Sequence, residues 1–117
     1  MDKQAVQLNE QAIDLSSRGN YKDAVACFLS AIHIEKKNSL LWYNLGITYR
    51  DSGDLEASKN ALFQAHKLEP ENVEYLETLS LVCYAEGNTT EAFVWANRAL
   101  EINPDNPHIW NNVGVYH

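Results

Sequence analysis

Apolar residues recur along this chain at the spacing of one helix face, in segments separated by short polar turns. The clearest segment is 39–52, where Trp42, Leu45, Gly46 and Tyr49 lie at i, i+3, i+4 and i+7 and form one stripe. Asn20 and Asp54 are expected to cap the helices that follow them. The pattern predicts helices at 3–17, 21–35, 39–52, 55–67, 73–86, about 90–101 and 107–117. Joints of a few residues between them indicate antiparallel helix pairs.

Glycine, alanine and apolar residues recur at matching positions every 34 residues, which indicates an array of repeats. The positions in register are Gly19, Gly53 and Gly87, then Ala31, Ala65 and Ala99, and then Ile34, Leu68 and Ile102. Gly46 is in register with Ala12, Ser80 and Gly114, which are all small. Because a small residue sits one turn from Trp42, we expect a neighbouring helix to approach closely there.

Residues 42–49 read W-x2-L-G-x2-Y, and Ala65 and Pro70 follow at the spacing that resembles the tetratricopeptide repeat. Ser58 stands where this family usually has Ala, and Gln11 where it usually has Leu. The resemblance implies an all-α fold, a right-handed α-solenoid of antiparallel helix pairs with about seven helices. It also implies a single domain, 1–117, with full units at 5–38, 39–72 and 73–106. Residues 107–117 then form the first helix of a fourth unit or a capping helix.

The net charge of −7 is concentrated toward the end of the chain. The first unit has four basic and four acidic residues, the second has three and five, and the third has one and six. An acidic chain repels phosphate backbones, so we expect no nucleic-acid binding. No apolar run approaches the length of a membrane span, and residues 1–11 lack the features of a signal peptide. These features predict a cytoplasmic protein that does not enter membranes.

Residues that carry chemistry are scattered. No His lies four positions from another His or from a Cys, and neither a phosphate-binding loop nor a nucleophile motif is present. Cys27 and Cys83 lie within helical patterns, which favours small buried hydrophobes over a disulfide. The sequence therefore predicts a protein that is not an enzyme and that has no metal and no cofactor.

The resemblance also implies a binding site, because the first helix of each pair lines a concave groove in this family. The candidate peptide-binding residues lie at helical spacing on a face distinct from the Trp42 stripe. They are Asn9, Ile13, Tyr43, Asn44, Ile47, Arg50, Glu74, Glu77, Thr78, Leu81, Tyr84, Asn111 and Asn112.

Two features of this set suggest peptide recognition. The amides of Asn9, Asn44, Asn111 and Asn112 both donate and accept, so they can pair with a peptide backbone. Ile13, Ile47, Leu81 and Val115 form an apolar row at one register position. This row either forms the groove floor or belongs to the core, and the sequence leaves both readings open.

Chaperone-binding members of the family hold an acidic EEVD-type tail with Lys, Arg and Asn side chains. At the matching positions of this chain only Asn44 fits, and Glu74 places a negative charge where a cation is needed. We therefore expect no tight binding to such a tail. Glu74 and Glu77 favour a basic or amine-bearing peptide instead.

These observations favour a protein–protein interaction module that binds a peptide or protein segment. The alternative is a regulatory or substrate-recruiting segment of a larger enzyme, such as a glycosyltransferase with such repeats. Ile109, Val113 and Tyr116 of the last helix are expected to leave an apolar end face, through which the chain could self-associate.

Overall fold

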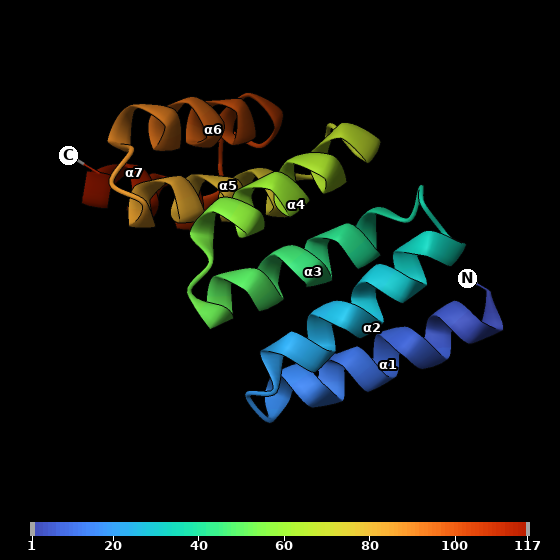
Figure 1. The fold of residues 1–117 in the computed structure, drawn as a ribbon. Coiled ribbons are helices and arrows are strands. Elements are labelled where there is room, and N and C mark those ends of the chain that lie inside the picture. Colours follow the sequence, from blue (N-terminus) through green and yellow to red (C-terminus); the bar gives the residue numbers. More distant parts are fainter. Residues whose placement is uncertain (1, 117) are drawn as a thin grey trace.

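The computed structural model describes residues 2–116, and in that range it contains helices and turns but no strands. The helices are α1 (Lys3–Ser17), α2 (Tyr21–Ile34), α3 (Ser39–Ser52), α4 (Leu55–Leu68), α5 (Val73–Ala85), α6 (Thr89–Ile102) and α7 (Pro107–Tyr116). Figure 1 shows them stacked in chain order, from α1 at one end to α6 and α7 at the other. The predicted α-solenoid is confirmed, and the predicted helix bounds agree to within one residue over the described range.

The first helix of each full pair ends at a glycine in the left-handed region. Gly19, Gly53 and Gly87 have φ values of 79°, 91° and 87°, which side chains with a Cβ rarely adopt. After Gly53, the amide of Asp54 returns to the carbonyl of Tyr49 at 2.9 Å. This closed turn reverses the chain within two residues and sets the second helix antiparallel to the first.

Side chains cap most helix starts. Asp2, Asn38, Asp54, Asn72 and Asn88 each accept a backbone N–H bond from the first turn of the next helix. Asn20 occupies the N-cap position of α2, as predicted, but its side chain makes no such bond.

A glutamate after the second helix closes each of the first two pairs. Glu35 follows α2 and accepts a hydrogen bond from the Asp2 amide at 3.1 Å, at the start of α1. Glu69 follows α4 and accepts from the Ser39 hydroxyl, at the start of α3, and from the Tyr75 hydroxyl at 3.1 Å. The open ends of the pairs are thereby tied together.

Within a pair, the two helices approach most closely at small residues. A Cβ added to Gly46 would lie 2.7 Å from Cγ of Leu62 and 3.3 Å from the carbonyl oxygen of Ser58. The Ser58 hydroxyl donates to the Gly46 carbonyl at 2.7 Å. The third pair uses the same two positions with the roles exchanged, since Ser80 donates to the Ala92 carbonyl at 2.8 Å. Ser58 therefore departs from the family's usual Ala without leaving a buried hydroxyl unpaired.

The pairs stack around two groups of buried side chains. The first group lies between α1 and α4, and its largest fully buried side chains are Phe28, Leu41 and Leu45. Leu62 and Leu76 belong to the second, which continues to α7. Trp42 is only partly buried against the first group, and its indole donates to the Lys36 carbonyl at 3.1 Å.

An ion-pair cluster also joins the second pair to the third. The Lys59 ammonium on α4 lies 3.1 Å from Glu86 and 3.9 Å from Glu91. Cys83 is buried, and burial raises the pKa of its thiol to about 12, so the thiol stays protonated. Both cysteines are free thiols, as predicted, although Cys27 is only half-buried.

The final helix is less exposed than the sequence suggests. Ile109 and Tyr116 are buried, and Val113 packs against the second group. The prediction that these three residues form an apolar end face was therefore wrong, because α5 and α6 cover them. The exposed apolar residues of α7 are instead Trp110, at 55%, and Val115, at 63%. Within the described range, no helix is long and apolar enough to cross a membrane.

His66 on α4 packs edge-on against Trp95 of α6, with ring centroids 5.3 Å apart. Its buried Nδ1 lacks a hydrogen-bond partner among the described residues. Burial lowers the pKa of His66, and the nearby Arg98 guanidinium lowers it further, because both disfavour the imidazolium.

Matched substitutions test the close approach inside a pair. Gly46→Ala should destabilise the fold by about 1–3 kcal/mol, because its Cβ meets the buried Leu62. Gly114→Ala, at the same register on α7, has no atom within 4 Å and should stabilise by up to about 1 kcal/mol through helix propensity. Urea unfolding measures the free energy of unfolding of both variants. Equal changes in the two variants would contradict the close helix contact at Gly46.

His66 should make stability depend on pH. Its folded-state pKa lies below the unfolded value of 6.5, so between the two values the unfolded chain binds more protons. The free energy of unfolding should therefore fall as pH drops below about 6.5. Thermal melts from pH 7 to 5 should show a shallower decline for His66→Gln than for the parent, and parallel curves would reject the role of His66.

Candidate functional site

The first helices of successive pairs contact one another, α1 with α3 and α5 with α7. Their outward faces therefore lie side by side along one face of the stack, which is the face that becomes concave in arrays of such repeats. We call this surface the inner groove. It is defined by the faces of α1, α3, α5 and α7 that carry Ile13, Ile47, Leu81 and Val115.

The apolar row lies at the surface and not in the core. Ile13 is 48% exposed, Leu81 38% and Val115 63%, while Ile47 is half-buried. The reading of this row as core is thereby excluded for Ile13, Leu81 and Val115, and its role as the floor of a binding groove stays a prediction. Four apolar side chains in one register give the inner groove a continuous strip on which apolar ligand groups could lie.

The strip deepens into a hollow of about 340 Å³ between α1 and α3. Its lining includes the predicted residues Ile13, Asn44 and Ile47. The remaining lining residues are Ser16, Ser17, Phe28, Thr48 and Asp51. Phe28 reaches the hollow from α2 and supplies its base, so the hollow combines an apolar bottom with polar walls.

Two of the predicted amides bind each other across the groove. Asn44 Nδ2 donates to Asn9 Oδ1 at 3.1 Å, which bridges α3 to α1. Within the described chain, Asn9 Nδ2 and Asn44 Oδ1 form no other hydrogen bond, so a donor group and an acceptor remain for a ligand. Asn111 is exposed and Asn112 half-buried on α7, where neither amide bonds to the described residues.

Aromatic and acidic groups meet where α3 faces α5. The Tyr43 hydroxyl donates to Glu74 Oε1 at 3.1 Å, and the Tyr43 ring lies 5.0 Å from the Tyr75 ring. Burial raises the pKa of Tyr43, which keeps the hydroxyl protonated as a donor. Glu77 is half-buried one turn along α5 and makes no hydrogen bond or ion pair with the described residues.

Other predicted residues differ in how far they reach the surface. Tyr84 is exposed and stacks on Tyr116 with centroids 4.7 Å apart. Arg50 is paired with Asp51 at 3.3 Å. Thr78 is only 6% exposed, and its hydroxyl donates to the Glu74 carbonyl at 2.9 Å. Thr78 therefore supports α5 from beneath the groove surface and presents little of itself to a ligand.

The charges along the inner groove are mostly negative. Glu10, Asp51, Glu74 and Glu77 supply carboxylates, and Arg50 supplies the one Lys or Arg charge that we place on these faces. Because Arg50 is already paired with Asp51, the uncompensated charge of the groove is negative. The described residues contain no group of His, Cys, Asp and Glu side chains suited to a metal ion.

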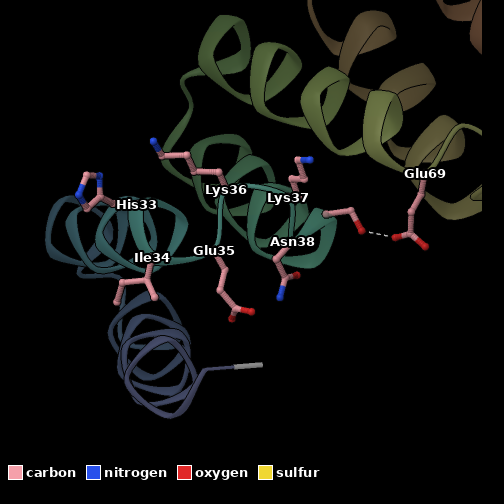
Figure 2. Close-up of a pocket in the computed structure, with 8 residues that line it drawn as sticks. His33, Ile34, Glu35, Lys36, Lys37, Asn38 and Glu69 are labelled. Carbon is pink, nitrogen blue, oxygen red and sulfur yellow. Dashed lines mark hydrogen bonds between the residues drawn. The ribbon is translucent and has the colours of Figure 1, made fainter.

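A larger, more open hollow lies outside the groove, beside the turn from α2 to α3. Figure 2 shows Lys36 and Lys37 at this turn, with Glu69 reaching it from the neighbouring pair. The sequence analysis did not single out this hollow. Glu69 is already occupied by Ser39 and Tyr75, and the two lysines extend into solvent. We therefore assign this hollow to the closure of the helix pair.

Comparisons with known proteins agree with this architecture. The model of the family described as the CABIN1 N-terminal domain matches residues 5–109. Calcineurin-binding protein 1 of Arabidopsis thaliana is 33% identical over 81 residues, which is 69% of this chain and 4% of that protein. The TPR repeat-containing protein MJ1428 of Methanocaldococcus jannaschii is 26% identical over 83 residues, 71% of this chain and 15% of that protein. The chain thus spans a small part of these relatives.

Solved structures give the same fold at low identity. The first TPR of Spaghetti (RPAP3), bound to the HSP90 peptide SRMEEVD, has a TM-score of 0.89 at 19% identity, covering 99% of this chain and 92% of that one. The Yersinia enterocolitica type III secretion chaperone SycD, in complex with a peptide of the translocator YopD, has a TM-score of 0.88 at 15% identity, covering 99% and 94%. With the 34-residue period, these matches identify the repeats: the chain belongs to the CABIN1 N-terminal domain family, and its helix pairs are tetratricopeptide repeats.

Proposed function

We propose that this chain is a protein–protein interaction module that binds an extended peptide segment in its inner groove. The observation that carries the proposal is the exposed apolar strip with its hollow between α1 and α3, flanked by the partly unoccupied amides of Asn9 and Asn44. Exposed apolar side chains in one concave row are costly in water unless a partner covers them. Peptides are bound in two structures of similar fold, RPAP3 and SycD, which supports the proposal by analogy.

The charge of the groove further favours a basic peptide. The RPAP3 domain holds the acidic peptide SRMEEVD, and an acidic tail needs unpaired cations around its carboxylates. Here Arg50 is paired with Asp51, and Glu74 and Glu77 lie on the neighbouring helix. Like charges facing each other across an interface are repulsive, so an acidic ligand is disfavoured and a basic one attracted.

A matched pair of charge insertions tests the site. Ile13 in the groove and Val94 on α6 are similarly exposed, at 48% and 45%, so Ile13→Asp and Val94→Asp should have similar effects on folding. On an array of ten-residue peptides of varied composition, the parent should enrich peptides of net positive charge. Ile13→Asp should reduce binding to the enriched peptides at least about tenfold, because an apolar ligand group would have to desolvate the new carboxylate, a cost that exceeds the added attraction for the positive charges of the peptide.

Val94→Asp is the control and should bind as the parent does. Circular dichroism melts confirm that both variants are folded. Enrichment of acidic peptides, or equal loss of binding in the two variants, would contradict the proposed site.

The amide bridge gives a second test. A double-mutant cycle with Asn9→Ala and Asn44→Ala should show a coupling of about 0.5–1.5 kcal/mol in the free energy of unfolding, because the two side chains bond to each other in the free protein. Each single substitution should also weaken the binding of peptide to the protein. A coupling of zero would mean that the bridge does not form in solution.

We also propose that the chain self-associates through the outer face of α7. This proposal rests on other residues than the end face predicted from the sequence. Gly46 is packed against Leu62, whereas Gly114 in the same register meets no atom within 4 Å, and Trp110 beside it is exposed. This face, defined by Trp110 and Gly114, resembles a helix contact with one side uncovered among the described residues.

Sedimentation over a concentration series checks this second proposal. The parent should form dimers as concentration rises, and Trp110→Ser should shift the equilibrium toward monomer. A parent that stays monomeric at high concentration would rule it out.

A further inference from the structure

The geometry points to a two-point ligand. It would be a peptide with an apolar side chain in the hollow between α1 and α3, and a lysine or arginine four or five residues away against Glu74 and Glu77 of α5. This inference rests on the proposed function and adds the chemistry and the spacing of the partner.

The apolar point is the hollow between α1 and α3 on the inner groove. Ile13 and Ile47 form its edges and Phe28 its base, while Asn44 stands on its wall. A volume of about 340 Å³ exceeds that of a single leucine or phenylalanine side chain, so the hollow admits one such side chain with the adjoining backbone. The amides of Asn9 and Asn44 lie where that backbone would pass, with a donor and an acceptor unused.

The cationic point lies one helix further along. Tyr43 holds Oε1 of Glu74 through a 3.1 Å hydrogen bond, and the Tyr43 ring rests on Tyr75, so this carboxylate is held in place. The second oxygen of Glu74 forms no bond within the described chain. Glu77 adds a half-buried carboxylate that has no ion-pair partner there. A cation between them would meet two carboxylates and the edge of an aromatic cluster, which suits an ammonium or a guanidinium.

Among the described residues, no lysine or arginine forms an ion pair with Glu74 or Glu77. Arg50, on the same face of α3, is paired with Asp51 beside the hollow, nearly two turns from Tyr43. Lys59 is held by Glu86 and Glu91 between the second and third pairs. The carboxylates of Glu74 and Glu77 therefore remain available to a charge that the ligand brings.

The separation of the two points sets the spacing in the ligand. Ile47 lies one helical turn beyond Tyr43, a rise of about 6 Å. The hollow lies between α1 and α3, so one and a half helix spacings of about 8–10 Å separate it from α5, and together with the rise this gives about 15 Å between the hollow and the α5 carboxylates. An extended peptide advances about 3.3 Å per residue, so four or five residues bridge this distance.

The test uses the full chain and synthetic peptides. Twelve-residue Gly/Ser/Asn host peptides would carry one leucine and one lysine separated by one to eight positions, in both orders, with leucine-only and lysine-only hosts. Fluorescence anisotropy gives the Kd of each at two salt concentrations. The tightest binding should occur at separations of four or five, about tenfold tighter than the leucine-only host, and this advantage should shrink at high salt.

Matched variants assign the cationic point. Glu74→Gln with Glu77→Gln should abolish the advantage of lysine while leaving leucine-only binding unchanged, because the shape of the groove is kept. Glu101→Gln, exposed on α6, is the control and should bind as the parent does. The two-point ligand would be overturned if the affinity did not depend on the leucine–lysine spacing. It would also be overturned if the Glu74/Glu77 variant bound the leucine–lysine peptides as tightly as the parent does.

The outcome also separates this inference from the proposed function. Leucine-containing peptides that bind at the hollow irrespective of lysine would retain the groove as a peptide site and reject the two-point ligand. If neither these peptides nor those on the array bind the folded protein, both proposals fail.

Discussion

The close approach of two helices at small residues is the contact on which the rest of this structure depends. At Gly46 the space that a Cβ would fill is taken by Leu62, and the Ser58 hydroxyl satisfies the Gly46 carbonyl from the opposite helix. Tight spacing inside each pair brings the large side chains of neighbouring pairs within reach of one another, so the pairs stack into a continuous core. A bulkier residue at this position would separate the helices and loosen both contacts at once.

The inner groove is a consequence of that packing. When one face of each first helix is committed to its pair, the opposite face turns outward, and the stacking of the pairs places these faces side by side. Ile13, Leu81 and Val115 become exposed in one row because they share a register position, and not because any of them lies in a loop or pocket of its own. Binding surfaces built this way are extended and shallow, which suits a chain segment better than a compact small molecule.

The negative charge is distributed unevenly along the stack of helices. The third repeat carries most of the net charge, and its carboxylates lie in two different environments. Glu86 and Glu91 are joined to Lys59 and help hold the second pair to the third. Glu74 and Glu77 face the inner groove, where Glu74 is positioned by a tyrosine from the preceding repeat. The same acidic composition thus stabilises one side of the stack and leaves the other side negatively charged, which is the basis of the proposed preference for a basic ligand.

Local rules in the sequence determined the helices, their ends and the 34-residue period. Glycines such as Gly53 adopt positive φ, and Asp54 caps the next helix, through interactions that span only a few residues. The resemblance to the tetratricopeptide repeat predicted which helices would line the groove. How deeply each groove residue lies was decided by the tertiary structure alone. Thr78 shares a register position with Asn44, yet it is covered by its neighbours.

The tertiary structure also decided the bonds between distant residues and the burial of the last helix. Asn44 bonds to Asn9, 35 positions away, and no local pattern marks that pairing. Ile109 and Tyr116 are buried because α5 and α6 extend over them, whereas Trp110 on the same helix is exposed. Burial at the edge of a helix face depends on the angle and distance of the neighbouring helix. Those are properties of the whole stack, which residue spacing in one segment does not contain.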